Sequence, residues 1–272
     1  MLKGRDVLGL AQAGTGKTAA FVLPILQRLT RSPLHRVRVL IVAPMRELAE
    51  QIHQASVDLA RKTRIRSVTV YGGVSRNRQV AALRRGAEIV IACLGRLLDL
   101  LSDGSIDLSH VEVMVLDEAD RMCDMGFLPD IRRIFKALPA RRQTLFFSVT
   151  MPGEIRGLAD RMLDDPVTVQ ISIIAPVETG SHAFYPLSHK LKKQLLLVTL
   201  QQTATGRVLI FTRTKHRARN LARYLEEPDD RVLALQGNMS QDRRRQAIQG
   251  FWDGRYDILV ATDYVNSRVG GV

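Results

Sequence analysis

Short apolar runs rich in β-branched residues alternate with longer stretches of helical period along most of the 272-residue chain. The runs lie at residues 7–10, 37–42, 67–71, 88–92, 111–116 and 143–147, and again at 207–211, 231–235 and 256–261. Runs this short and apolar throughout are typical of parallel strands covered on both faces. The alternation therefore predicts an α/β fold with mainly parallel sheets covered by helices and right-handed crossovers.

The alternation pauses after Pro166. Residues 171–181 contain Pro176 and Gly180 and show no helical period, so we predict a linker there. This divides the chain into a first domain at residues 1–170 and a shorter second domain at 182–272. In the second domain we expect helices at 216–225 and 241–251.

The chain is strongly basic, with 40 Lys and Arg against 27 Asp and Glu and a formal net charge of +13. This excess favours a polyanionic partner such as nucleic acid, because each cation that neutralises a phosphate releases counterions. A basic surface that only keeps the protein soluble is the simpler interpretation, so charge alone does not decide.

Composition excludes several other classes of protein. No apolar run is long enough to span a bilayer, and residues 1–6 carry no apolar signal core. Cys93 and Cys123 are too few for a disulfide scaffold or a cysteine-built zinc site. We therefore expect a cytoplasmic protein with no membrane partner.

A glycine-rich stretch at residues 11–18 lies between the apolar run at 7–10 and a predicted helix start. Gly14 and Gly16 allow successive N–H groups to face one anion, Lys17 would reach the outer phosphates, and the Thr18 hydroxyl would hold Mg²⁺. The candidate nucleotide-binding residues are Ala13, Gly14, Thr15, Gly16, Lys17 and Thr18. The alternative is an ordinary glycine-rich turn that enters a helix.

Carboxylates follow the apolar run at 111–116. Such a position lies at the edge where parallel sheets bind ligands. Asp117 is placed to hold Mg²⁺, usually through water, and Glu118 could act as the general base for an attacking water. We therefore predict Lys17, Asp117 and Glu118 as catalytic residues. A charged turn in which Asp120 caps the following helix is the alternative.

Taken together, these residues resemble the DEAD-box ATP-dependent RNA helicases of helicase superfamily 2, whose name motif is the Asp-Glu-Ala-Asp sequence at 117–120. Further motifs follow in the family's order over nearly the whole chain. The resemblance implies a P-loop NTPase fold with two tandem RecA-like domains. It also implies ATP and Mg²⁺ as cofactors, RNA as partner, and ATP-dependent local unwinding of duplexes.

The resemblance also implies roles for residues in the later motifs. Asp120, Ser148 and Thr150 would couple hydrolysis to strand separation. The implied RNA-binding residues are Pro44, Arg46, Gly72, Gly73, Gly95 and Arg96, and in the second domain Arg213, Gly237, Gln241, Arg244 and Thr262. Arginine binds phosphate bidentately and glycine admits close backbone approach, so these contacts would read the RNA backbone rather than its bases. Each arginine taken alone is also compatible with a solvated surface charge.

The sequence departs from the family pattern at several points. Cys93 stands where the family has threonine, and Gln236 stands where it has histidine. The family's adenine-reading segment and its downstream arginine-finger motif have no counterpart in the 272 residues. Our hypothesis is a helicase truncated at both ends, with weak catalysis and an incomplete second sheet whose edge allows self-association.

Two alternatives remain open at this stage. The first is a catalytically weak RNA-binding protein or fragment that holds RNA without unwinding it. The second is a DNA-directed superfamily 2 enzyme, because backbone contacts distinguish RNA from DNA mainly through the 2′-OH.

Overall fold

The computed structural model describes residues 1–12, 14–30, 35–171, 183–202, 206–226, 231–236, 239 and 241–262, without the side chains of 241, 242 and 245. The chain divides into two compact units, Met1–Ala175 and Pro176–Val272, which we describe separately. Except for Ile171, the predicted linker lies outside the described residues. The domain boundaries at 170 and 182 therefore stay predictions.

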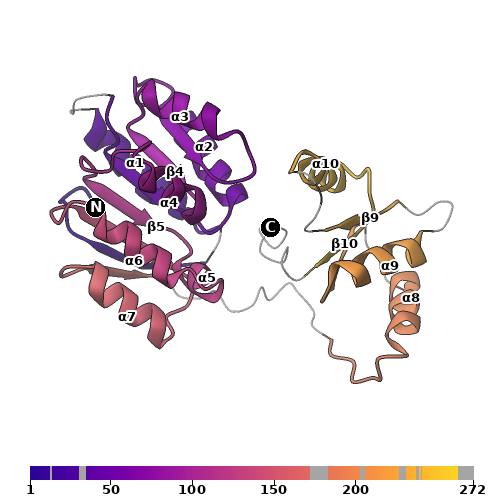
Figure 1. Cartoon of the computed structure of the whole chain (residues 1–272). Coiled ribbons are helices and arrows are strands. Elements are labelled where there is room, and N and C mark those ends of the chain that lie inside the picture. Colours follow the sequence, from indigo (N-terminus) through magenta and orange to yellow (C-terminus); the bar gives the residue numbers. More distant parts are fainter. Residues whose placement is uncertain are drawn as a thin grey trace. The chain divides into compact units, whose positions relative to one another are not determined.

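The first unit is a parallel sheet with helices on both faces (Figure 1). Its strands are β1 (Val7–Leu10), β2 (Val39–Val42), β3 (Ser67–Val70), β4 (Ile89–Ala92), β5 (Val113–Leu116), β6 (Gln143–Ser148) and β7 (Val167–Gln170). Its helices are α1 (Lys17–Leu29), α2 (Arg46–Ala60), α3 (Arg76–Arg84), α4 (Leu94–Ser102), α5 (Ala119–Asp124), α6 (Leu128–Lys136) and α7 (Gly153–Met162). The seven strands are ordered β3-β4-β2-β5-β6-β1-β7, and every neighbouring pair is parallel. The predicted parallel α/β fold is confirmed.

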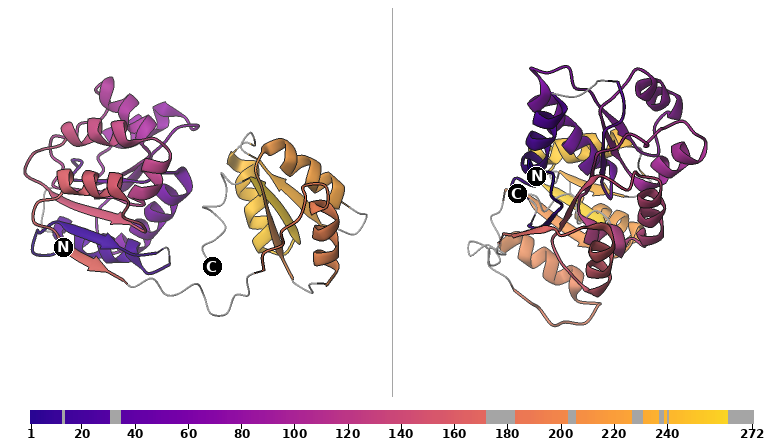
Figure 2. Two further views of the ribbon diagram at one scale, coloured as in Figure 1. Left: turned by 90° about the horizontal axis from the view of Figure 1, so that it is seen from below. Right: turned by 90° about the vertical axis from the view of Figure 1, so that its left-hand side faces the viewer.

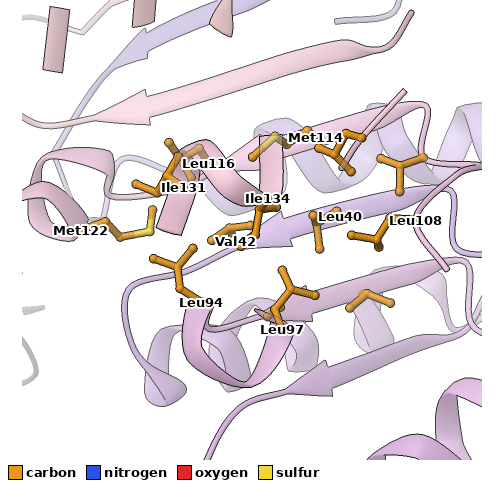
Figure 3. Packing of buried hydrophobic residues seen from close by; sticks show 14 of the residues in the cluster. Leu40, Val42, Leu94, Leu97, Leu108, Met114, Leu116, Met122, Ile131 and Ile134 are labelled. Carbon is orange, nitrogen blue, oxygen red and sulfur yellow. The ribbon is translucent and has the colours of Figure 1, made fainter. Parts of the chain in front are cut away.

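Alternate residues of the central strands supply two hydrophobic layers. Leu40, Met114 and Leu116 face one layer, where they pack with residues of α4 and α6 such as Leu97 and Ile134 (Figure 3). The neighbouring strand residues face the opposite layer, which α1 and α2 cover. Because β2, β4, β5 and β6 are buried along their whole length, their sequences are continuous apolar runs.

One close contact joins β1, β6 and α1. The ring of Phe147 packs against Phe21, with 5.4 Å between the ring centroids. A Cβ atom at Gly9 would lie 2.4 Å from the Phe147 ring, which is closer than any real contact. Gly9 therefore provides the room that the Phe147 ring occupies over β1.

The sequence predicted that the alternation of strands and helices pauses after Pro166. This prediction was wrong, because β7 begins at the next residue. This strand pairs in parallel with β1 at the edge of the sheet, and all four of its residues are exposed. An exposed edge strand buries little apolar surface, so it lacks the continuous apolar run of the central strands. Asp6 holds the segment that precedes β7 beside β6, because its carboxylate accepts hydrogen bonds from the Thr144 and Asp164 N–H groups at 2.7 and 2.8 Å.

The second unit contains a parallel three-stranded sheet within its described residues, ordered β8-β10-β9. The elements are β8 (Val208–Thr212), β9 (Val232–Leu235) and β10 (Ile258–Thr262), with α8 (Lys192–Gln202), α9 (Lys215–Leu225) and α10 (Gln241–Trp252). Figure 2 shows α10 on one face of this sheet and α8 and α9 on the other. Nowhere in the described part of the chain is a helix sufficiently long and apolar to cross a bilayer.

The sequence did not predict α8. Its apolar residues are consecutive at 195–198, which hides the helical period. The helix forms because Leu196, Leu197 and Leu200 pack against the cluster that includes Ala218 and Ala222 of α9. Tertiary packing, not the local pattern, therefore decides this element.

Candidate nucleotide and nucleic-acid site

Every candidate residue of the first unit that the structure describes follows the carboxyl end of a strand or lies at it. Because the strands are parallel, these ends form one edge of the sheet. In the order of the strands across the sheet, the candidates are Gly72 and Gly73 after β3, Gly95 and Arg96 after β4, Pro44 and Arg46 after β2, residues 117–120 after β5, Ser148 and Thr150 at the end of β6, and the glycine-rich loop after β1. The predicted RNA residues thus occupy one half of the edge and the predicted nucleotide residues the other half.

The glycine-rich loop has the backbone geometry that its sequence predicts. Gly14 and Gly16 have φ angles of 82° and 81°, a conformation that side chains other than glycine rarely adopt. Gly16 caps α1, which begins at Lys17, and the Thr15 hydroxyl donates to the Gln12 carbonyl at 2.8 Å. Lys17 Nζ donates to the Ala11 carbonyl at 2.9 Å, so its ammonium lies along the loop. Ala13 lies outside the described residues.

Asp117 is a buried carboxyl group at the end of β5, with 2% of its surface exposed. Its backbone N–H donates to the Val42 carbonyl at 3.0 Å, and its Oδ1 accepts from the Glu118 N–H at 3.1 Å. Burial raises the pKa of Asp117 to about 6, and the nearby Lys17 ammonium opposes that rise. A cation placed beside such a buried carboxylate stabilises its charged form.

The oxygen ligands of this site fit magnesium. The Thr18 hydroxyl and the Asp117 carboxylate are hard oxygen donors, and Mg²⁺ is usually bound by one or two such protein groups together with water and substrate phosphates. Among the described residues there is no cluster of three or more His, Cys, Asp or Glu side chains that could hold a metal by themselves. The donor set therefore suits a metal that arrives with a nucleotide rather than a cage built by protein alone.

Replacing Asp117 by Asn should stabilise the ligand-free protein. The native carboxyl binds its proton more tightly than the unfolded one, since folding raises the pKa from 3.8 to about 6. The protonated carboxyl therefore contributes its full stabilisation of the fold below pH 3.8. This stabilisation is lost as the carboxyl ionises while the pH rises through about 6. The shift corresponds to about 3 kcal/mol. In thermal unfolding followed by circular dichroism, we expect Asp117→Asn to raise Tm by roughly 5–10 °C near neutral pH and to lose this advantage in acid.

Asp160→Asn is the matched control for this prediction, because Asp160 is exposed on α7. An equal gain in both variants would contradict the idea that the buried carboxylate destabilises the fold. A gain for Asp117→Asn that persisted below pH 3.8 would contradict it as well.

Glu118 adopts a left-handed backbone conformation, with φ of 54°, and caps α5. Its Oε2 accepts from Arg121 Nη1 at 3.0 Å, and both side chains are partly buried. Arg121 was not predicted from the sequence. Its signal was the spacing of three residues, which places two side chains on neighbouring positions of one helical turn.

Asp120 links the carboxylate strand to the end of β6. Its Oδ2 accepts from the Val149 N–H at 3.1 Å, the Thr150 N–H at 2.8 Å and the Thr150 hydroxyl at 2.9 Å. In return, the Asp120 N–H donates to Ser148 Oγ at 3.2 Å. The alternative in which Asp120 caps the following helix is wrong, because α5 begins at Ala119 and Asp120 lies inside it. The structure therefore brings together the three predicted coupling residues, Asp120, Ser148 and Thr150.

Ser148 also contacts the glycine-rich loop. Its carbonyl accepts from the Ala11 N–H at 3.1 Å, and its side chain is fully buried. Since β6 lies between β1 and β5 in the sheet, Ser148 touches both halves of the predicted nucleotide site.

In the other half of the edge, Arg46 lies against the glycine pair. Gly73 has a φ of 78°, and a Cβ atom there would lie 2.3 Å from Arg46 Nη1. The guanidinium carbon of Arg46 is also 6.0 Å from the centre of the Tyr71 ring. Gly73 is therefore required both by its backbone conformation and by the space that Arg46 fills.

Arg96 belongs to the same half of the edge. Its Nη1 donates to Gln79 Oε1 at 3.0 Å, and Gln79 Nε2 donates to the Tyr71 carbonyl at 2.9 Å. Gln79, which holds Arg96 beside the loop that contains Gly72, was not predicted from the sequence. Pro44 is buried. A Cβ atom at Gly95 would meet open space, so its neighbours do not require glycine.

In the second unit, candidate residues again follow parallel strands. Arg213 is exposed directly after β8, and Thr262 ends β10. Thr212 and Ala261 join these two strand ends, because the Thr212 hydroxyl donates to the Ala261 carbonyl at 3.3 Å. Arg244 Nε is buried without a hydrogen-bond partner among the described residues. Gly237 and the side chain of Gln241 lie outside them.

A glycine-rich loop that leads from a parallel strand into a helix, with a buried aspartate at the end of a second strand, defines a P-loop α/β protein. The sequence profile described as DEAD/DEAH box helicase matches residues 1–158 of the chain. The profile described as Helicase conserved C-terminal domain matches residues 189–267. This chain therefore belongs to the DEAD/DEAH box helicase family, and the predicted fold of two RecA-like domains is confirmed.

Individual relatives agree with this assignment. The DEAD-box ATP-dependent RNA helicase RhpA of Helicobacter pylori is 40% identical over 264 residues, which are 97% of this chain and 53% of the relative. The ATP-dependent RNA helicase DeaD of Escherichia coli K12 is 41% identical over 97% of this chain and 42% of its own length. The chain thus spans about half the length of the curated relatives it matches.

A solved structure also matches. The crystal structure of a DEAD box protein from the hyperthermophile Methanococcus jannaschii aligns with 99% of this chain and 72% of its own, with a TM-score of 0.61 and 29% identity. Both units of the chain therefore have a counterpart in one solved protein of the family.

Proposed function

We propose that this chain binds and hydrolyses ATP in response to RNA and locally unwinds short RNA duplexes. The observation that carries the proposal is the hydrogen-bond network of Asp120 with Val149 and Thr150. This network lies on the sheet edge between the candidate RNA residues and the glycine-rich loop. A change at the carboxylates after β5 would therefore reach the end of β6 through the contacts of Asp120 with Ser148, Val149 and Thr150.

The nucleotide would be held by the loop that begins α1. The N–H groups around Gly14 and Gly16 would bind phosphate, and Lys17 would exchange its bond to the Ala11 carbonyl for the outer phosphates. Thr18 and Asp117 would hold Mg²⁺, which when bound neutralises charge on the phosphate oxygens. Asp117 would then ionise at lower pH, because a cation favours its charged form.

Glu118 would accept the proton of the attacking water. In the structure its carboxylate accepts a hydrogen bond from Arg121, which fixes its position. A base that is held in place before substrate arrives loses little freedom in the reaction.

RNA would contact the opposite half of the edge through phosphates. Arg46 and Arg96 present guanidinium groups beside the glycine pair, where the chain admits a close approach of the RNA backbone. In the second unit, Arg213, Arg244 and Thr262 would add contacts. Cys93 and Gln236 replace side chains that the family uses near these contacts, so we propose that RNA stimulates hydrolysis only weakly in this chain.

Nucleotide-dependent RNA binding tests the proposal. We expect the affinity of the chain for a labelled single-stranded RNA to rise about tenfold when a non-hydrolysable ATP analogue and Mg²⁺ are added. Asp120→Ala should bind each ligand and lose that increase, because it removes the contacts to Val149 and Thr150. Asp124→Ala, an exposed residue of the same helix, is the control and should retain it.

The same assay separates the alternatives. RNA affinity that ignores the nucleotide would indicate a binding protein without a motor function. An equal response to a DNA strand of the same sequence would indicate a DNA-directed enzyme, because only the 2′-OH distinguishes the two backbones.

A further inference from the structure

Helix α9 carries an unusual concentration of basic side chains. Its basic residues, all exposed, are Lys215, His216, Arg217, Arg219 and Arg223. No Asp or Glu occurs in the sequence between Gly206 and Leu225. Lys215, Arg219 and Arg223 follow one another at intervals of four residues, which places them along one ridge of the helix. We call these three residues the α9 ridge.

The charges of α9 oppose its own stability. Lys215 and Arg217 occupy the first turn, where the helix dipole disfavours cations, and that turn has no acidic residue. Within the ridge, each neighbouring pair of like charges four residues apart also destabilises the helix. An acidic residue occurs in the first turn of α2, α5, α6 and α7, whereas α1, α3, α4 and α8 lack one as α9 does. Sequences that break local rules in this way do so most often where function requires it.

Nothing in the described residues compensates these charges. None of the ion pairs in that part of the chain includes an α9 side chain. The packing of α9 depends on its other face, where Ala218, Ala222 and Leu225 are buried against Val260. The ridge is therefore not needed to hold the helix on its sheet.

The ridge begins beside the predicted RNA contacts of the second unit. Arg219 Nη2 donates to Gln236 Oε1 at 3.3 Å, and Gln236 follows β9 directly and precedes Gly237 in the sequence. From Arg219 the ridge continues along the helix to Arg223. On another side of α9, Lys193 Nζ of α8 lies 4.9 Å from the centre of the Tyr224 ring.

We propose that the α9 ridge binds the phosphates of an RNA segment that flanks the one held at the strand ends. The proposal rests on the proposed function, since it extends an RNA path. Eight residues of helix rise about 12 Å, so the three ridge side chains are spaced to meet separate phosphates of one strand. Because the contacts would be to phosphate, they would be independent of sequence and would weaken with salt.

Neutralising the ridge tests this proposal in the full chain. The variant is Lys215→Gln/Arg219→Gln/Arg223→Gln, and the probes are single-stranded RNAs of about 10 and about 30 nucleotides. The matched control, Arg132→Gln/Arg133→Gln/Lys136→Gln, removes three exposed positive charges from α6. Fluorescence anisotropy at several salt concentrations measures affinity for each RNA, and thermal unfolding measures stability.

We expect the ridge variant to bind the longer RNA about tenfold more weakly and to bind the shorter RNA as before. The slope of log Kd against log salt for the longer RNA should fall by about 2, from three lost phosphate contacts. The α6 control variant should change neither the affinity for the longer RNA nor the slope of log Kd against log salt. The melting temperature of the ridge variant should stay the same or rise, because repulsion is removed.

Three results would overturn the proposal. The first is an unchanged affinity of the ridge variant for the longer RNA. The second is an equal loss of that affinity in the α6 control. The third is saturable binding of an acidic peptide by the unaltered chain, when the ridge variant no longer binds the peptide but keeps its RNA affinity. Loss of short-RNA binding on Arg46→Ala/Arg96→Ala would support the proposed function separately. Equal affinity of the unaltered chain and the ridge variant for the longer RNA would overturn the ridge proposal alone, whereas failure of the unaltered chain to bind the shorter RNA would overturn the proposed function on which it rests.

Discussion

Replacing Glu118 by Gln should lower the rate of ATP hydrolysis about 10²–10⁴-fold and leave nucleotide affinity nearly unchanged. The amide has the size of the carboxylate and can still accept from Arg121, so the local structure should persist. The amide cannot accept the proton of the attacking water, so proton transfer in the hydrolysis step slows. Single-turnover hydrolysis at saturating RNA measures the rate, and a fluorescent ATP analogue measures binding.

Glu154→Gln is a suitable control, since Glu154 is exposed on α7 and outside the candidate site. If Glu118→Gln keeps more than about a tenth of the rate, another group acts as base and the assignment is wrong. Loss of nucleotide binding together with the rate would show instead that Glu118 supports the fold of the site.

Lys17→Ala should weaken binding of Mg²⁺–ATP by about 10–150-fold, the range for loss of a hydrogen bond from a charged group. The ammonium is well placed for this role, because it lies along the loop at the Ala11 carbonyl and near Asp117. Its removal should also raise the pKa of Asp117 further, since it takes away the main charge that favours the ionised carboxylate. Nucleotide binding in the variant should therefore fall more steeply with acid than in the unaltered chain.

Isothermal titration calorimetry at two pH values measures both effects. Lys3→Ala removes an exposed lysine from the first residues of the chain and serves as control. Equal affinity in the Lys17 variant and the control would contradict the predicted phosphate site. An equal pH response in the two would contradict the link between Lys17 and Asp117.

The predicted nucleotide half of the site could be proposed from the sequence because its residues are nearly contiguous. Gly14, Gly16 and Lys17 lie in one loop, and Asp117 and Glu118 directly follow a buried strand, so local pattern and spacing are sufficient. The Asp120 network joins residues about thirty positions apart, and the family resemblance, not the residue pattern, placed Thr150 there. Gln79 was not predicted because nothing in its local sequence distinguishes it from other helical side chains, and the one local signal for Arg121 was its spacing of three residues from Glu118.

The strands and helices also divide into those that a local sequence pattern predicts and those that it does not. The strands of the first sheet's interior were predicted because each is buried on both faces and therefore continuous in apolar residues. The β7 strand and α8 were not, since one is an exposed edge and the other forms by packing on α9. Long-range contacts such as that of Arg46 with Gly73 depend on how strands pair, and no local pattern encodes them.

The contact between Gly9 and Phe147 has a consequence for how this chain can diverge. Any side chain at position 9 would collide with the ring, while a smaller residue at 147 would leave the Phe21 ring without its partner. A single change at either site should therefore be deleterious, whereas a larger residue at 9 combined with a smaller one at 147 could refill the same volume. The two positions are 138 residues apart in sequence but neighbours across β1 and β6, and they should be inherited as a pair.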